Sequence, residues 1–190
     1  KTGTINLAEY GKKFEDAGNL IEEAGKKFQK FSLASSAGLT ASLKTAIDFE
    51  DAFAGVIKTV DATDEQIEEL RKGIIAMSTE LPASTTEISS VAEAAGQLGI
   101  QADNILSFTK TMIDLGESTN LTADEAASQL AKFANIMQMS QKDFDKLGST
   151  IVDLGNNFAT TESDIVEMAM RLAGAGKQVG LTEGEVLGLA

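Results

Sequence analysis

The sequence MIDLGESTNLTADEAASQLAKFANIMQMSQKDFDKLGSTIVDLG, residues 112–155, contains the signals that decide the fold. It opens with MIDLG at 112–116 and closes with IVDLG at 151–155, so a similar motif returns after about 39 residues. Between them, Thr122 and Glu125 have the spacing of a capping box, in which both side chains bond to backbone amides at a helix start. A period of this length is typical of helical repeats, so each repeat is predicted to be two helices joined by a short turn.

Helix-start and turn signals recur on both sides of this stretch. Further capping boxes are expected at TDEQ 63–66, STTE 84–87 and TEGE 182–185. TESD at 161–164 is a weaker version, because its carboxylate is shorter. Turn-like triplets follow the first helix of each repeat, at 99–101, 138–140 and 180–182. The spacing from the second triplet to the third is slightly longer than from the first to the second, which indicates a small insertion near 174–177.

These signals predict three helical pairs: 85–98 with 103–116, 123–137 with 141–156, and 162–178 with 183 onward. Two more helices are expected before them, over 40–58 and 64–79. The first helix of each pair carries an apolar stripe at helical spacing; in the third pair it is Ile165, Met168, Ala169 and Leu172. One hairpin cannot bury such a stripe alone, so neighbouring pairs are expected to stack.

Residues 1–38 have a different pattern, with apolar and aromatic residues recurring every seven positions. The larger ones define a candidate interaction face: Leu7, Tyr10, Phe14, Ile21, Phe28 and Phe31. Gly11, Gly18 and Gly25 recur at the same interval. Each glycine costs about 1 kcal/mol in a helix relative to alanine, so their regular placement indicates close approach of another backbone. This helix either packs back on its own domain or associates with copies of itself or a surrounding protein wall.

The predicted fold class is therefore all-α, with an N-terminal heptad helix followed by helical-hairpin repeats of about 39 residues. The expected domains are a coiled-coil-like helix and hinge over 1–38, connecting helices over 39–80, and the repeat region over 81–190. The chain starts without Met and stops within an apolar-periodic run. We therefore expect it to be part of a longer protein, with the repeat region truncated at the C-terminus.

Composition excludes several classes of function. The 190 residues contain no His and no Cys, so the usual ligands of zinc, haem and iron–sulfur sites are missing. The net charge of −13 argues against a nucleic-acid-binding face. All of the acid excess lies in residues 51–190, which contain 22 acidic and 9 basic residues. The longest uncharged stretch has 13 residues, fewer than the ~20 needed to span a bilayer, so no membrane-spanning segment is expected.

Two motifs have some features of a functional site. The acidic group Asp61, Asp64, Glu65, Glu68 and Glu69 offers paired carboxylates of the kind that glycosidases use. It lies at a predicted helix start, where carboxylates oppose the helix dipole, so we interpret it as structural. GAGK at 174–177 lacks the spacing of a phosphate-binding loop and is expected near a helix end. We therefore predict no catalytic, cofactor-binding or metal-binding residues.

The order of these motifs resembles the core region of phage tail tape measure proteins. The resemblance rests on AIDFEDAFAGV at 46–56, ATDEQIEELRKGI at 62–74, TELPASTTEISSVAEAAGQLGIQADNI at 79–105 and the stretch at 112–144. It extends from 46 to 190, and the glycine-spaced heptads resemble the segment that usually precedes this core. Gln101 and Gln138 depart from the family pattern, since a Gly or Ser is more typical there.

The resemblance implies a non-enzymatic virion protein that acts as a ruler and scaffold for the tail tube. It implies a location in the tail lumen after synthesis in the host cytoplasm, and exit ahead of the DNA on ejection. Implied partners are tail tube, tail tip or baseplate and tail assembly chaperone proteins, together with self-association, and no cofactor is implied. The alternative is an α-solenoid adaptor or adhesin module that binds a protein partner. A third, weaker alternative is a carboxylate-pair cell-wall hydrolase.

Overall fold

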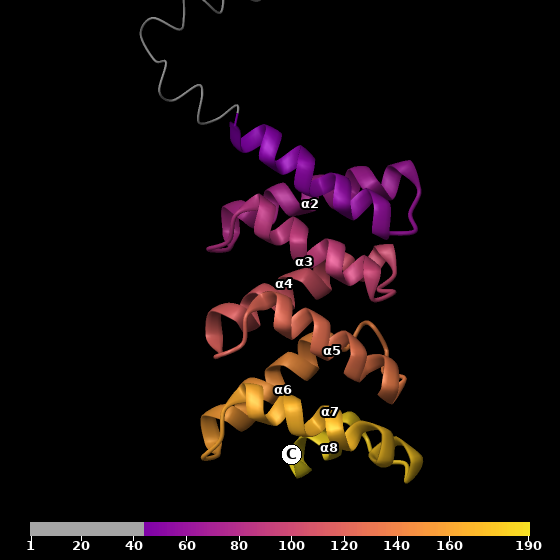
Figure 1. Cartoon of the computed structure of the whole chain (residues 1–190), viewed down its shortest axis with the longest axis vertical. Helices are drawn as coiled ribbons and strands as arrows, with labels where there is room; N and C mark the ends of the chain where they lie inside the picture. Colours follow the sequence, from indigo (N-terminus) through magenta and orange to yellow (C-terminus); the bar gives the residue numbers. More distant parts are fainter. Residues whose placement is uncertain (1–43) are drawn as a thin grey trace, which may run out of the picture. The chain divides into compact units, whose positions relative to one another are not determined.

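A computed structural model describes residues 44–190, and every element in this part of the chain is a helix. A first helix covers residues 44–59. It is followed by α2 (Asp64–Glu80), α3 (Thr85–Gln97), α4 (Ala102–Ser118), α5 (Ala123–Met137), α6 (Phe144–Asn157), α7 (Glu162–Gln178) and α8 (Glu183–Leu189), as labelled in Figure 1. The all-α prediction is confirmed. The predicted heptad helix and hinge lie outside the described residues.

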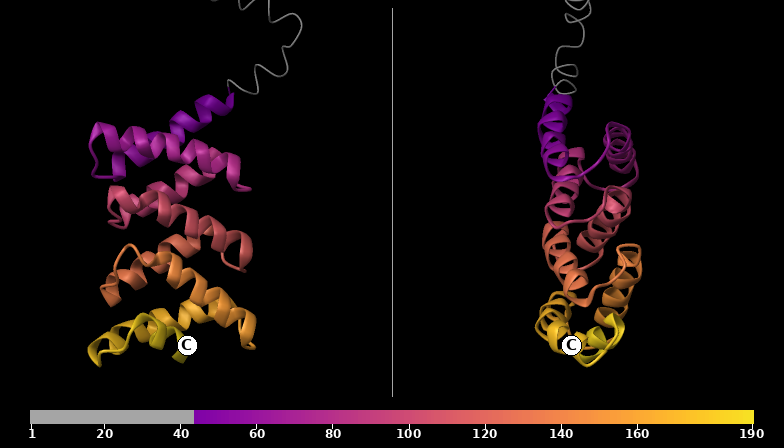
Figure 2. Two further views of the ribbon diagram at one scale, coloured as in Figure 1. Left: turned by 180° about the vertical axis from the view of Figure 1, so that it is seen from behind. Right: turned by 90° about the vertical axis from the view of Figure 1, so that its right-hand side faces the viewer.

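The chain divides after Ile47, and Asp48–Ala190 forms one compact unit. Within it, α3, α5 and α7 pack side by side in one row, and α2, α4, α6 and α8 form a second row. Each helix also contacts its neighbour in the other row, which gives the two-layered stack seen edge-on in Figure 2. The three helical pairs fit the repeat that the sequence predicts. The proposed domain boundaries after residues 38 and 80 stay predictions.

A continuous apolar core fills the space between the rows. Across the second row, Phe108 of α4 and Phe144 of α6 meet edge to face, with ring centroids 4.6 Å apart. In the first row, the stripe predicted for α5 is buried, and the stripe predicted for α3 is buried except for Leu98, which is partly buried. The stripe predicted for α7 is partly wrong, because Met168 is 40% exposed and Leu172 is only partly buried. No later helix within the described residues covers that side of α7.

Three helix starts carry the complete capping box that the sequence predicts, at Thr63, Thr122 and Thr182. In α5, the Thr122 hydroxyl accepts from the Glu125 amide at 3.2 Å, and the Glu125 carboxylate accepts from the Thr122 amide at 3.0 Å. This backbone hydrogen bond, with a second from the Thr122 hydroxyl, lowers the pKa of Glu125 below its ordinary value. The signals therefore fix where these helices begin.

Two other starts differ from the full box. At α7 the Thr161 hydroxyl accepts from the Asp164 amide, but the short carboxylate reaches only the Thr161 hydroxyl. This is the weaker cap that was predicted. At α3, Ser84 accepts from the Glu87 amide at 3.2 Å, yet no reciprocal bond closes the box, so the prediction for STTE is half right. The predicted start of α6 at 141 is also wrong, because a turn from Ser140 to Asp143 precedes the helix.

The predicted turns are helix ends in which one residue adopts the left-handed conformation. That residue is Gly99, Gln138 or Gly180, with φ of 82°, 55° and 82°. In each case the next amide bonds to a carbonyl five residues back: Ile100 to Ala95, Met139 to Ala134 and Leu181 to Gly176. These are Schellman motifs, which satisfy the last carbonyls of a helix. Glutamine at 138 is the one non-glycine residue among the three.

Glycine also permits close contact between consecutive pairs. A Cβ on Gly116, near the end of α4, would lie 2.9 Å from the backbone nitrogen of Ala123 at the start of α5. Gly155 holds the equivalent place in α6, and its Cβ would collide with the Glu162 side chain. The glycine of each DLG triplet is therefore explained by the tight connection to the next helix.

We predict opposite effects for two Gly→Ala substitutions inside helices. Gly116→Ala should lower the stability of the protein, because the new methyl meets backbone atoms that cannot yield without moving α5. Gly174→Ala in α7 should raise the free energy of unfolding by up to about 1 kcal/mol, since nothing lies within 4 Å and alanine is the better helix former. Thermal unfolding followed by circular dichroism measures both. Equal stabilisation by the two substitutions would contradict the packing explanation for Gly116.

We also predict that Gln138→Gly stabilises the protein by about 0.5–1 kcal/mol. A side chain in the left-handed region costs roughly 1–2 kcal/mol, and glycine removes this cost. Part of the gain is offset because glycine has more conformational freedom to lose on folding. Gln129→Gly, within α5, is the matched control and should lose about 1 kcal/mol. Chemical denaturation of the three proteins tests this; a Gln138→Gly variant less stable than the original would show that the glutamine side chain makes a stabilising contact.

Candidate interaction surfaces

A broad groove lies in the second row, between α4 and α6, and has a volume of about 470 Å³. Its lining is Thr111, Asp114, Leu115, Ser118, Asp145, Gly148, Ser149, Val152, Asp153 and Asn156. Gly148 lets the two helices approach, since a Cβ there would lie 3.0 Å from the Thr111 methyl group. The groove is thus a shallow, polar depression between neighbouring repeats rather than an enclosed pocket.

Three aspartates give this groove its charge. Asp114 accepts from the Lys110 ammonium at 2.7 Å, and Asp153 accepts from the Asn157 amide at 3.0 Å, each one turn along the same helix. Asp145 lies near the start of α6, at the end opposite to Asp153. Carboxylates that are paired with exposed neighbours along one helix contribute little to stability. Their main effect is to make the groove negative, which suits a partner surface rich in hydrogen-bond donors or cations.

A second groove, of about 340 Å³, lies between α6 and α8 in the same row. Lys146 and Asp143 on its rim form an ion pair of 2.5 Å. The hydrogen bond to Asp143, together with the negative charges of Asp143 and Asp145, raises the pKa of Lys146. Grooves therefore lie between α4 and α6 and between α6 and α8, so this face of the stack is repetitive.

In the first row, the repeats are joined by a polar seam near the helix ends. The Lys177 ammonium donates to the Met137 carbonyl at 2.5 Å, and the Asn135 amide donates to the Leu98 carbonyl at 3.3 Å. Both donors lie three residues before the left-handed residue of their own helix. Gly96 has the same place in α3, where a Cβ would lie 2.9 Å from the Thr59 carbonyl carbon. Each first helix therefore contacts the carboxyl end of the one before it.

Two further side chains connect neighbouring repeats. The Gln141 side chain accepts from the Gln101 amide at 2.8 Å and donates to the Gly99 carbonyl at 3.0 Å. The Asn120 side chain accepts from the Ser163 amide at 3.1 Å and donates to the Ser163 hydroxyl at 2.7 Å. The turns are thus held in register across the repeat by side chains that bond to backbone groups.

The two motifs that have features of a functional site lie at helix ends. Asp64 and Glu65 lie in the first turn of α2, in agreement with the helix-dipole interpretation. GAGK lies at the carboxyl end of α7, and its lysine donates across the seam to Met137. Sequence reasoning missed this role, and it also missed Asp145 and Gly148 in the groove. Within 44–190, no three acidic side chains come together as a possible metal site.

The sequence-predicted interaction face is not part of this geometry. Leu7, Tyr10, Phe14, Ile21, Phe28 and Phe31 lie outside the described residues, so the heptad face stays a prediction. None of the helices described between 44 and 190 has both the length and the apolar character required to cross a bilayer.

Comparisons with known proteins agree with the resemblance in the sequence. The family model of phage-related minor tail proteins matches residues 71–190, from within α2 to the last helical pair. A curated protein of Halomonas phage phiHAP-1, described as a probable tape measure protein, is 25% identical over 153 residues. The match covers 74% of this chain but 18% of that protein, so the chain spans less than a fifth of the curated relative's length. No solved structure shows significant similarity to the chain.

The matched residues include all three helical pairs, both grooves and the polar seam. The tape measure resemblance is therefore confirmed by two independent comparisons. The chain belongs to the family of phage-related minor tail proteins, and it is similar to a protein described as a probable tape measure protein.

Proposed function

We propose that the chain serves as a structural segment of a tape measure, a scaffold around which tail tube subunits assemble and which sets the length of the tail. The observation that carries this proposal is the match to a tape measure protein over 74% of the chain. Its proposed location is the tail lumen of the virion, and its proposed partners are tail tube, tip or baseplate and chaperone proteins. On ejection it would leave ahead of the DNA.

The folded stack spans a short distance for the number of residues that it contains. Helices in a row pack 8–10 Å apart, so each 39-residue pair extends the stack by about 10 Å. Laid out as one helix at 1.5 Å per residue, the same 39 residues would span about 58 Å. The continuous core, which includes Phe53, Phe108 and Phe133, would be exposed by such opening. We therefore propose that this segment stays folded in the assembled tail and adds a short, fixed span.

Removing one repeat from the phage gene tests this proposal. Deletion of residues 119–157 joins Ser118 to Phe158, which stands one repeat after Thr119, so the register of the stack is kept. The mean tail length should fall by about 10 Å, and duplication of the same residues should lengthen it equally. Electron micrographs of many particles provide the measurement.

The other outcomes are distinct. A change of about 58 Å would support a ruler but contradict the folded form, and normal tails of unchanged length would exclude this segment from length control. Loss of tails after the register-preserving deletion would favour the alternative, a solenoid module that docks a partner through the acidic grooves of the second row. Deletion of 119–147, which joins Ser118 to Gly148 and is ten residues shorter than one repeat, breaks the register and serves as the control for misfolding.

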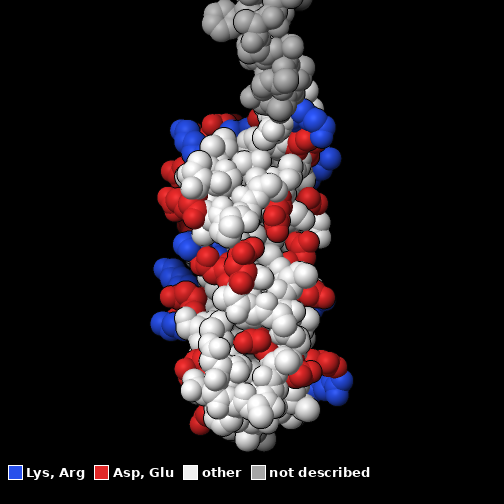
Figure 3. Space-filling view, turned by 90° about the vertical axis from the view of Figure 1, so that its left-hand side faces the viewer, with Lys and Arg blue, Asp and Glu red and all other residues white. Residues whose placement is uncertain are grey.

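The acidic surface suits a protein that must separate from DNA. Figure 3 shows Asp and Glu side chains along the length of one face, with Lys and Arg mainly at its edges. We predict no detectable binding of duplex DNA at ~0.15 M salt, because repulsion between phosphates and this surface opposes contact. A variant with Asp114, Asp145 and Asp153 replaced by lysine should gain binding at low salt. Fluorescence anisotropy of labelled DNA measures both; tight binding by the original chain would contradict the proposal.

A further inference from the structure

The connection between α6 and α7 differs from the two earlier connections between helical pairs. In those two, a buried apolar residue stands directly before the cap: Ala83, which is 9% exposed, before α3, and Leu121, which is 4% exposed, before α5. Such a residue packs against the first turns of the helix and fixes the angle at which the chain enters it. In the third connection this position is Thr160, which is polar and exposed. The start of α7 therefore lacks the hydrophobic staple that the starts of α3 and α5 have.

A hollow lies where the missing side chain would pack. It has a volume of about 160 Å³, and its lining includes Leu154 of α6, Ile165 of α7 and Leu187 of α8, beside Thr160. Ile165 is the fourth residue of α7, which is the position that a staple residue contacts. Apolar side chains around unfilled space lose packing contacts, and this lowers the stability of the elements that carry them.

The backbone of this connection also has less support than the backbone between α4 and α5. There, the Thr119 hydroxyl donates to the Leu115 carbonyl at 2.7 Å and accepts from the Leu121 amide at 3.1 Å. Phe158 stands in the place of Thr119 one repeat later, and it has no hydroxyl, so neither bond is repeated. The chain between α6 and α7 is thus less constrained by side-chain hydrogen bonds.

The helix that follows the connection is anchored less deeply than its equivalent. Among the largest fully buried side chains, α5 contributes three and α7 contributes Ile165 alone. The hydrogen bonds that join α7 to earlier repeats come from Lys177 to the Met137 carbonyl and from Asn120 to Ser163. These bonds involve exposed or partly buried groups, which exchange readily with water and contribute only modestly to stability.

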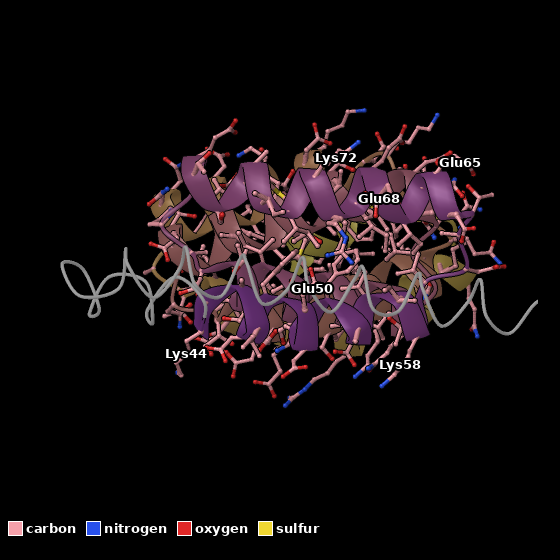
Figure 4. The ribbon with its side chains drawn as sticks, turned by 90° about the horizontal axis from the view of Figure 1, so that it is seen from above. Lys44, Glu50, Lys58, Glu65, Glu68 and Lys72 are labelled. Atoms are coloured by element: carbon pink, nitrogen blue, oxygen red, sulfur yellow. The ribbon has the colours of Figure 1, made fainter. Side chains whose placement is uncertain are left out.

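The opposite end of the compact unit is held more firmly. The Arg71 guanidinium carbon of α2 lies 4.4 Å from the centroid of the Phe53 ring. The same guanidinium forms ion pairs with Glu50 of the first helix and Glu68 of α2. Figure 4 shows both glutamates between these two helices. A cation over an aromatic ring stabilises the contact between the helices that carry them, so opening is not expected to begin here.

We propose that the α6–α7 connection is a hinge, at which α7 and α8 swing away from α5 and α6 while the earlier helices stay folded. The missing staple, the hollow and the weaker backbone support all lie at this connection. Opening there breaks the bonds of Lys177 and Ser163 to earlier repeats but leaves the contact between Phe108 and Phe144 intact. In the proposed tape measure, the hinge would let the stack give way at one defined point under tension. That role rests on the proposed function, whereas the hinge is a property of the folded chain.

Hydrogen exchange of the 190-residue protein, followed by mass spectrometry of peptic fragments, tests the hinge. Amides of α7 should exchange at least about tenfold faster than amides of α5, because local opening frees them without unfolding of the whole unit. Thr160→Leu supplies the staple and fills the hollow, so it should slow exchange in α7 at least about threefold and leave α3 unchanged. Ala159→Leu is the matched control, since it adds the same side chain at an exposed position outside the hollow and should change neither helix.

A reversible crosslink provides a second measurement. The Asn120 side-chain nitrogen lies 2.7 Å from the Ser163 hydroxyl oxygen, and the chain contains no native Cys. In a protein with Asn120→Cys and Ser163→Cys, the oxidised form should protect α7 nearly as well as α5, because the disulfide holds the hinge closed. Reduction should restore fast exchange in α7.

Three results would overturn the proposal. One is equal exchange in α5 and α7 of the original protein. Another is fast exchange in α7 that neither Thr160→Leu nor the disulfide slows, since this would indicate fraying from the chain end rather than opening at the connection. The third is faster exchange in α2 than in α7, which would locate the first opening at the opposite end. None of these results bears on tail length, so the failure of the hinge and the failure of the ruler are distinguishable.

Discussion

The constraint on which this structure depends is that a single helical pair cannot bury its own apolar stripe. Each helix inside the described stack is covered from two directions, by helices of the other row and by its neighbours in its own row. The contact between Phe108 and Phe144 shows the consequence, because a residue of one repeat is buried only when the following repeat is present. Stability is therefore a property of neighbouring pairs, as in other stacked repeats. The helix lengths, turns and seams all serve to keep these pairs in register.

The insertion in the third pair shows how strictly that register is kept at the ends. From cap to left-handed turn, α5 extends from Thr122 to Gln138, whereas α7 extends from Thr161 to Gly180. The extra residues lengthen the helix but change neither end. Lys177 keeps its place three residues before the turn and still bonds across the seam. The Schellman bonds and the seam at the end of α7 are therefore made in spite of the added residues.

The helices and turns could be predicted because their signals are local. A threonine with a glutamate or glutamine three residues later marks the starts of α2, α5 and α8, and the recurring triplets locate all three left-handed residues. The surfaces could not be predicted, since they depend on which helix lies opposite. The residues around Lys177 do not indicate that it will donate to a carbonyl 40 residues earlier. Likewise, the residues around Met168 do not indicate that its side chain will be exposed. The groove residues were missed for the same reason.

The composition of the first row explains why the stack is compact. Its helices bury many alanines: Ala92 and Ala95 in α3, Ala126, Ala127, Ala131 and Ala134 in α5, and Ala169 and Ala173 in α7. Small side chains let helices approach toward the lower end of the usual spacing of roughly 8–10 Å, but each buries little apolar area. Such a row therefore gains stability by adding pairs rather than by enlarging one core, and it gains little length with each addition.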